Sequence, residues 1–207
     1  MRSVEIVSRA EEIIMKKYIM TEKTKVVDGH TLYRIQAVKD FGDVKAGDLG
    51  GWIEKEANLS HEGKCWVYDD AQVYADAKVI QDARVKGYAQ ISGYAQISGK
   101  AQISDYVTVA SHAEVYGFAN ISGYADISGN ANVFGYAWID DYVRIGGKAK
   151  VYGSTSIFGY AHVYGYAQVY GYAVIAEYVV LHGKVKVGGR AGILGETEID
   201  GNQIITD

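Results

Sequence analysis

Proline is absent from this chain of 207 residues, and cysteine occurs once. Without proline, every backbone N–H inside the chain can donate a hydrogen bond, which suits strands stacked above and below one another. The single cysteine, Cys65, excludes a disulfide within the chain and favours a reducing cytoplasm. We expect Cys65 to be a buried structural thiol. No apolar run approaches the ~18 residues of a membrane span and no secretory signal is recognisable, so we expect a cytoplasmic protein without membrane contact.

The chain also lacks a large excess of either charge, because 21 basic residues nearly balance 25 acidic ones and leave a net charge of −4. A nucleic-acid-binding protein normally shows a basic face, so nucleic acid is not an expected partner. The chain is rich instead in glycine and tyrosine, with 25 and 18 residues respectively. These two residue types follow a strict period, which predicts the fold.

The period is six residues long, and 24 positions from Val67 to Ile205 are all Ile, Val or Leu. Numbered from this aliphatic residue, the unit is aliphatic-x-Gly-x-Ala-x, as in the stretch 91–96. The small fifth residue lies two before the next aliphatic one, so both point to one side of a short strand. Glycine at the third position gives the backbone freedom for a corner. The pattern predicts a solenoid.

Aromatic residues recur at every third unit, at two positions of the unit. The fourth position holds Tyr88, Tyr106, Tyr124, Tyr142, Tyr160 and Tyr178, and the second holds Tyr116, Phe134, Tyr152 and Tyr170. Because the recurrence spans three units, each coil has three sides and equivalent residues stack in one line along the rod. We therefore predict an all-β solenoid, a three-sided parallel β-helix of about eight 18-residue coils.

The repeated units resemble the hexapeptide-repeat superfamily over residues 67–205, which implies a left-handed winding. A second resemblance covers the stretch 37–53 together with Leu59-Ser60 and 65–68. These residues are similar to the leader of bacterial and prophage-encoded hexapeptide proteins, some of them regarded as acyltransferases. The resemblance implies a cytoplasmic homo-oligomer, with a trimer as the expected form, and an origin in a mobile element.

The segment that precedes Val67 lacks the period. Ser8-Arg-Ala-Glu11 has the form of a capping box and predicts a helix that ends near Met20. The stretch 25–38 predicts a β-hairpin that turns at Asp28-Gly29. We expect a small α+β cap at 1–52 that covers the front of the rod. A left-handed β-helix is then expected at 53–207, with regular hexads at 67–205.

The outward-facing positions of the repeat carry the candidate functional surface, because stacking does not dictate them. Aromatic side chains gather there at Tyr116, Phe134, Trp138, Tyr152, Phe158, Tyr164 and Tyr170. Packing within a column explains each ring singly, but the breadth of the patch indicates an interface. The leading interpretation is a non-enzymatic, oligomeric binding or scaffold protein without a cofactor. It would sequester a small molecule or engage a host protein.

An acyltransferase that uses acyl-CoA, with its site between subunits, is the alternative. Such an enzyme needs a histidine base within reach of the acceptor group in a cleft. His162 beside Tyr164 is the candidate, whereas His30, His61, His112 and His182 are expected at the surface. Since the hexads run without insertion, no loop is expected to overhang a face and form a cleft within one chain. Enzymatic activity stays open, and the non-enzymatic interpretation is favoured.

We expect no metal site among the carboxylates, and a cation-binding edge formed by the recurring acids is the alternative. Asp70, Asp76 and Asp82 fall at three different corners of the triangle. Asp69, Asp105, Asp141 and Glu177 recur in every second coil, where they replace the glycine at one corner. Two coils are about 9.6 Å apart, too far for shared coordination. We expect these acids to be tolerated substitutes for glycine, since aspartate adopts left-handed backbone angles more readily than most residues.

Overall fold

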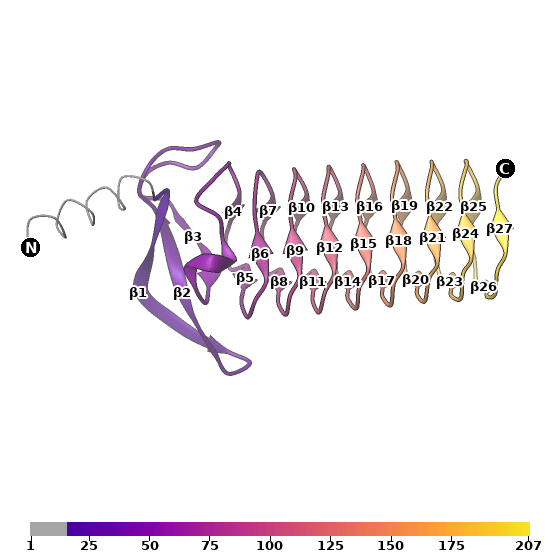
Figure 1. Cartoon of the computed structure of the whole chain (residues 1–207), viewed down its shortest axis with the longest axis horizontal. Helices are drawn as coiled ribbons and strands as arrows, with labels where there is room; N and C mark the ends of the chain where they lie inside the picture. The colour runs from indigo at the N-terminus through magenta and orange to yellow at the C-terminus, as the bar shows by residue number, and fades with distance from the viewer. Residues whose placement is uncertain (1–15) are drawn as a thin grey trace, which may run out of the picture.

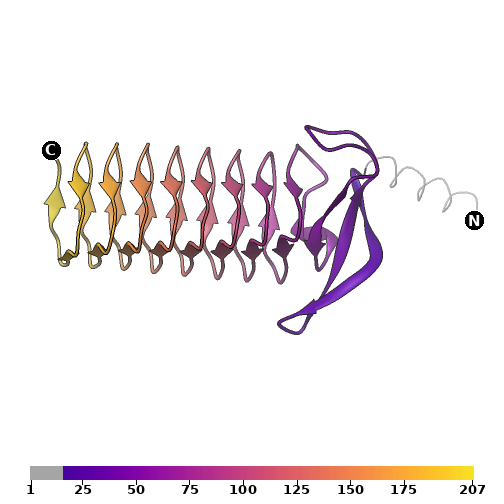
Figure 2. The ribbon, with the colours of Figure 1, turned by 180° about the vertical axis from the view of Figure 1, so that it is seen from behind.

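The chain forms a straight rod of stacked coils with an antiparallel hairpin at its amino-terminal end (Figures 1 and 2). The structure, a computed structural model, describes residues 16–207. Three parallel sheets run along the rod, one on each side of the triangle, which confirms the predicted three-sided β-helix. We call them sheets I, II and III, and each regular coil passes through sheet II, then sheet I, then sheet III. The corners between consecutive sheets are called edges II–I, I–III and III–II.

Sheet I contains β1 (Tyr18–Val27), β2 (His30–Ala37), β3 (Leu49–Ile53), β5 (Gln72–Val73), β8 (Gln90–Ile91), β11 (Thr108–Val109), β14 (Asp126–Ile127), β17 (Arg144–Ile145), β20 (His162–Val163), β23 (Val180–Leu181) and β26 (Glu198–Ile199). Sheet II contains β4 (Trp66–Val67), β7 (Arg84–Val85), β10 (Gln102–Ile103), β13 (Asn120–Ile121), β16 (Trp138–Ile139), β19 (Ser156–Ile157), β22 (Val174–Ile175) and β25 (Gly192–Ile193). Sheet III contains β6 (Lys78–Val79), β9 (Gln96–Ile97), β12 (Glu114–Val115), β15 (Asn132–Val133), β18 (Lys150–Val151), β21 (Gln168–Val169), β24 (Lys186–Val187) and β27 (Ile204–Ile205).

The core is the column of side chains inside the triangle. Every aliphatic first-position residue from Val67 to Val187 is at most 1% exposed, and the small fifth-position residues lie beside them. Successive coils pair in register, as in Gln102 with Asn120 and Ile103 with Ile121. Corner residues also donate to the next coil, so the Tyr88 N–H lies 2.7 Å from the Asp105 carbonyl oxygen. The absence of proline is explained, because strand and corner amides alike are used as donors.

The corner conformation explains the third position of the unit. Third-position residues have φ between +51° and +88°, whether glycine or one of the seven other residues found there. Asp141, with φ +61°, also accepts a hydrogen bond from the Gly159 N–H of the next coil at 3.0 Å through Oδ2. Asp69 and Asp105 make the same contact with Gly87 and Gly123. The prediction that these acids substitute for glycine at a left-handed corner is confirmed.

The amino-terminal segment is a hairpin of β1 and β2 that pairs antiparallel and turns at Asp28-Gly29, both with positive φ. The hairpin prediction is confirmed, although its first strand begins earlier than expected, at Tyr18. The helix predicted to reach Met20 is wrong at its carboxyl end. Tyr18, Ile19 and Met20 pair with Ala37, Gln36 and Ile35. The remainder of that prediction lies outside the described residues.

The first coil is longer than the regular ones. Ile53 pairs with Val73 and Leu59 bridges to Val79, whereas the regular coils repeat the shorter step from Val73 to Ile91. Strand β3 pairs with the hairpin on one side and with β5 on the other, so sheet I runs continuously from cap to rod.

With this first turn the rod has about nine coils rather than eight. Within residues 16–207, the 3-10 turn η1 (Glu56–Asn58) is the one helical segment. None of the helical structure described is long and apolar enough to cross a membrane.

The hairpin covers the front of the core and also overhangs one face. Tyr18 and Ile35 are fully buried in the same core as Val67, so the hairpin closes the front of that core. On the outer side of sheet I, Leu32 packs with Trp52 and Tyr74 in a second small cluster. The hexads carry no overhanging loop, as expected, but the hairpin overhangs sheet I, which the repeat pattern did not predict.

Candidate functional site

Four of the predicted aromatic residues form a continuous row on the outer face of sheet III. Tyr116, Phe134, Tyr152 and Tyr170 follow strands β12, β15, β18 and β21, one in each of four consecutive coils. Their ring centroids are 4.8, 5.0 and 5.5 Å apart, and the planes are tilted by 2°, 4° and 13°. All four are partly exposed. We call this row the sheet III ladder.

The sheet III ladder ends in a ring that tilts away from its neighbours. The next residue in the column is Gly188, and a Cβ built there would fall on the ring of Tyr170. The missing side chain thus lets the Tyr170 ring lean toward the next coil. Burial raises the pKa of the Tyr116 and Tyr152 hydroxyls, so both remain neutral donors at physiological pH. The ladder is an apolar row with hydroxyl groups at its margin.

The other three predicted residues lie on different faces. Trp138 in β16 and Phe158 after β19 belong to sheet II, where they are 50% and 36% exposed. Tyr164 follows β20 on sheet I. The structure therefore brings together four of the seven predicted residues. It separates the remainder across two other sides of the triangle.

A longer aromatic row occupies edge II–I. The six tyrosines from Tyr88 to Tyr178 stack with centroids 4.9 to 5.1 Å apart and planes within 9° of parallel. Each is about half exposed. We call this row the edge ladder. Its regularity follows from the constant coil length, as the spacing predicted, and each inner ring contacts one ring above and one below.

His162, the predicted base, begins strand β20 and projects from sheet I. Its ring meets Tyr164 edge to face at 5.5 Å. Burial, and then the charge of Arg144, lower the pKa of His162, so the ring is neutral at pH 7 and able to accept a proton. His182 lies on the same sheet, where Nε2 is 2.8 Å from Glu198 and Nδ1 is 3.1 Å from Asp200. The two histidines therefore have separate partners.

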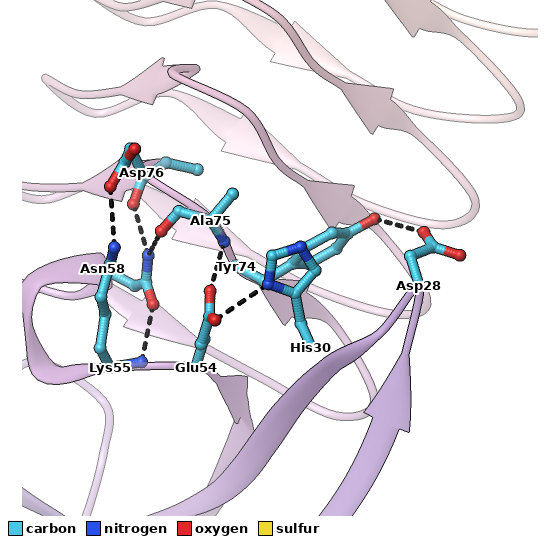
Figure 3. A network of polar contacts seen from close by, with 9 residues as sticks. Asp28, His30, Glu54, Lys55, Asn58, Tyr74, Ala75 and Asp76 are labelled. Carbon is cyan, nitrogen blue, oxygen red and sulfur yellow. Dashed lines mark hydrogen bonds and ion pairs between the residues drawn. The ribbon is translucent and has the colours of Figure 1, made fainter.

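A different histidine is held in a more defined geometry, beneath the hairpin overhang (Figure 3). His30 begins β2, and its Nδ1 lies 2.9 Å from Oε1 of Glu54. The second carboxylate oxygen of Glu54 accepts a hydrogen bond from the Ala75 N–H at 2.7 Å. Because both oxygens are engaged, the carboxylate is fixed in place. The hydrogen bond with His30 lowers the pKa of Glu54, which therefore stays ionised.

The remaining contacts of this network attach the hairpin and first coil to the regular rod (Figure 3). The Tyr74 hydroxyl donates to Oδ2 of Asp28 at 2.9 Å, and the His30 ring lies 5.2 Å from the Tyr74 ring. Lys55 pairs with Asp76 at 2.8 Å. The Asn58 amide donates to the carbonyl oxygens of Ala75 and Ala77. The network has an evident structural role as a seam between cap and rod.

The His30–Glu54 pair has chemical potential besides this structural role. A carboxylate only accepts, so in the neutral ring Nδ1 carries the proton and Nε2 is left as an acceptor. An acid that orients a histidine in this way is the arrangement used to hold a general base. This pair could not be predicted from the sequence, because His30 and Glu54 are distant along the chain and lie outside the repeat. Asp28-Gly29 was the available signal, since it places His30 at the start of the returning strand.

The expectation that four histidines besides His162 are surface residues is correct for His112 alone, because His30, His61 and His182 are only partly exposed. His61 stacks on Tyr18 at 4.3 Å, and burial lowers its pKa. The expectation for Cys65 is confirmed, since it is fully buried and burial raises the pKa of its thiol.

The Cys65 thiol has a buried neighbour that the sequence did not reveal. The Lys17 amino group lies 3.2 Å from the sulfur and donates to the Cys65 carbonyl oxygen at 2.8 Å. Desolvation lowers the pKa of Lys17. This contact joins the start of the hairpin to the first coil, two segments that are distant in the sequence.

The three aspartates of the first regular coil each have a separate contact. Asp70 accepts from Arg34 and Trp52, Asp76 pairs with Lys55, and Asp82 accepts from the Lys64 N–H. They lie at three different corners of the triangle, as the spacing predicted. Among residues 16–207 no group of three or more His, Cys, Asp or Glu side chains is placed to hold a metal ion.

A shallow groove of about 310 Å³ lies on sheet II. It is lined by Lys64, Asp82, Arg84, Lys100 and Gln102. None of the predicted site residues belongs to this groove, so it adds nothing to either candidate site.

Stacked hexapeptides around a three-sided core define a hexapeptide-repeat β-helix protein, and the predicted resemblance to that class is confirmed. No protein-family model matches the sequence. The chain is similar to a protein of Escherichia coli (strain K12) named "Uncharacterized acetyltransferase YdcK", with 43% identity over 63 residues. The match covers 27% of this chain and 19% of that protein's length.

Proposed function

We propose that the chain is a β-helical binding protein whose working surface is the sheet III ladder. The observation that carries this proposal is the row of four partly exposed rings on a flat sheet face. Rings locked by stacking lose little conformational entropy when a partner covers them, and tyrosine and phenylalanine are favoured in interfaces. The ladder is roughly 15 Å long, taking about 5 Å for each coil. A small planar molecule or one element of a host protein would fit it.

The ladder proposal is tested by truncating two of its rings. Tyr152→Ser with Tyr170→Ser should abolish binding of the probe 1-anilinonaphthalene-8-sulfonate, measured by fluorescence titration. The matched control is Tyr106→Ser with Tyr124→Ser, which removes two rings from the edge ladder on another side of the rod. The proposal requires the control to bind the probe as the wild type does. Equal binding by both double variants, or by neither, would overturn it.

An acyltransferase is the second candidate, supported by the name of the E. coli relative and by the histidines on sheet I. In this reaction a histidine takes the proton of an acceptor hydroxyl or amine as that group attacks the thioester carbonyl of acyl-CoA. The acyl–sulfur bond breaks, and coenzyme A leaves as the thiolate. His162 is neutral but lies on an open face, where it needs a second subunit to complete a cleft. His30 is already oriented by Glu54 beneath the hairpin.

Acetyl-CoA distinguishes the two candidate functions. The enzyme hypothesis predicts a thermal shift with acetyl-CoA and release of free thiol in the presence of hydroxyl- and amine-bearing acceptors. If His30→Gln loses thiol release but keeps the thermal shift, the base is His30 of the His30–Glu54 pair. If His162→Gln gives this result instead, the base is His162 on sheet I. His182→Gln is the matched control. Absence of both shift and release would exclude the acyltransferase hypothesis.

We also propose a cytoplasmic location, an origin in a mobile element and assembly as a homo-oligomer, with a trimer as the expected form. The single buried cysteine supports the location. The resemblance of the leader and repeat to prophage-encoded hexapeptide proteins supports the other two. The left-handed winding is likewise a prediction from that resemblance.

A further inference from the structure

Four lysines border the carboxyl-terminal half of the sheet III ladder. They are Lys148 and Lys184 at edge I–III, and Lys150 and Lys186 at the start of strands β18 and β24. We call these four residues the lysine border. No acidic residue occurs in the three coil segments that form this part of the face, 148–153, 166–171 and 184–189. The region is therefore positively charged on a chain whose net charge is −4.

The charges of the lysine border are available to a ligand. Lys148, Lys150 and Lys184 are exposed, and Lys186 is partly exposed. Among residues 16–207 no carboxylate forms an ion pair with any of the four. Gln168 pairs with Lys150 on one side and with Lys186 on the other, so its side-chain amide lies between the two lysines. These lysines are two coils, about 9.6 Å, apart. Their flexible four-carbon chains let both ammonium groups approach an anion placed above Gln168.

The lysine border and the sheet III ladder share their strands. Lys150 begins β18 and Tyr152 follows it, and the buried Val151 lies between them. Because side chains alternate along a strand, Lys150 and Tyr152 both point outward, with Cα atoms about 6.6 Å apart. One small ligand can therefore contact an aromatic ring and an ammonium group at the same time.

The lean of the Tyr170 ring adds a hydroxyl group at this end of the ladder. A Cβ built at Gly188 would fall on that ring and would lie 2.7 Å from the Tyr170 hydroxyl oxygen. Gly188 comes two residues after Lys186, with the buried Val187 between them. The hydroxyl thus reaches the coil of Lys186. A hydroxyl donor and a positive charge meet there, and together they favour an anionic oxygen.

The opposite end of the ladder carries the opposite charge. Glu114 is exposed and comes two residues before Tyr116, as Lys150 does before Tyr152. Burial, and then the charge of Glu114, raise the pKa of the Tyr116 hydroxyl, which places this carboxylate near the first ring. A polyanion that lay along the whole ladder would be repelled at this end. The charges therefore favour a short ligand with its anionic group near Tyr170.

We propose that the sheet III ladder binds a small aromatic molecule that carries one anionic group, namely a carboxylate, a sulfonate or a phosphate. The ring of the ligand lies along Phe134 and Tyr152. Its anionic group lies between Lys150 and Lys186, beside the Tyr170 hydroxyl. This inference rests on the proposed function of the ladder as a binding surface. It adds the class of ligand, because the lysines favour a charged molecule over an uncharged one of the same shape.

The experiment titrates the full chain with two fluorescent probes that differ in one group. The first is 1-anilinonaphthalene-8-sulfonate, and the second is N-phenyl-1-naphthylamine, the same ring system without the sulfonate. Lys150→Gln with Lys186→Gln should raise the dissociation constant of the sulfonate probe by about fivefold or more. The same double variant should bind the uncharged probe as the wild type does. Tyr170→Phe, which keeps the ring and removes the hydroxyl, should weaken binding of the sulfonate probe alone, by about threefold.

The matched control is Lys78→Gln with Lys100→Gln, which removes the same charge from exposed positions outside the ladder. Lys78 belongs to the same column of sheet III as Lys150. The control should bind both probes as the wild type does, and circular dichroism establishes that every variant is folded. An equal loss of the sulfonate probe in both lysine double variants would overturn the inference, because net charge alone would then explain it.

The two levels of the account fail in different ways. If Tyr152→Ser with Tyr170→Ser loses both probes, but Lys150→Gln with Lys186→Gln binds the sulfonate probe as the wild type does, the proposed function stands and this inference is wrong. If the tyrosine double variant binds both probes normally, the ladder is not the binding surface, and the proposed function fails together with the inference.

Discussion

Thr155 lies at a buried position of the rod where its methyl group packs well but its hydroxyl group does not fit. It is a fifth-position residue with no exposed surface, and its hydroxyl has no hydrogen-bond partner. Most of the six-residue units have alanine at this position, and four have valine, at positions 107, 143, 179 and 185. A buried hydroxyl without a partner costs about 1–3 kcal/mol. Because valine has nearly the same shape, Thr155→Val should raise the free energy of unfolding by about 1–2 kcal/mol.

Urea unfolding followed by circular dichroism measures this change, and an unaltered slope shows that the same surface is exposed on unfolding. Thr155→Ser is the matched control, because it keeps the hydroxyl and loses the methyl group. It should lower the free energy of unfolding by about 1 kcal/mol. A destabilised Thr155→Val would refute the assignment of this residue to the inside of the triangle without a polar partner.

Three further predictions concern the corner, the seam and the edge ladder. Gly123→Ala should cost about 2–3 kcal/mol in urea unfolding, because φ is +71° and the new Cβ would lie 2.6 Å from the Asp141 nitrogen; a loss near zero would contradict this packing. The pKa of Glu54 is lowered in the folded state, so its contribution is present at neutral pH and is lost as pH falls below about 4.3. Glu54→Gln should therefore make the melting temperature less dependent on pH between about pH 5 and pH 3. An equal pH dependence in variant and wild type would show that the contact with His30 does not form. Tyr124→Ser should lower the free energy of unfolding by about 1 kcal/mol through two lost ring contacts, whereas no change would show that the stack contributes nothing.

Most of the fold follows from residues that repeat. A side chain one coil from its equivalent meets the same surroundings, so Tyr106 could be placed above Tyr88 from the sequence alone. The left-handed corner at Asp141 was likewise predictable, because that residue stands where other units have glycine. The left-handed winding is predicted only from the resemblance to hexapeptide-repeat proteins, because no pattern in the residues distinguishes a left-handed from a right-handed coil.

The parts that could not be predicted depend on contacts outside the repeat. Lys17 meets Cys65, and His30 meets Glu54, through a hairpin whose path over sheet I no period encodes. The helix expected up to Met20 fails because pairing with β2 decides the conformation there, rather than the local pattern. The coil length already separates Trp138 from the sheet III ladder. The prediction of a single aromatic patch considered only that these residues are aromatic and face outward.

The most direct test of the binding surface is native mass spectrometry of the protein purified from its source cells. Wild type and the Tyr152→Ser, Tyr170→Ser double variant should be compared side by side. A small molecule or protein should be retained by the wild type and be absent from the double variant. Equal retention by both chains, or retention by neither, would contradict the role assigned to the sheet III ladder.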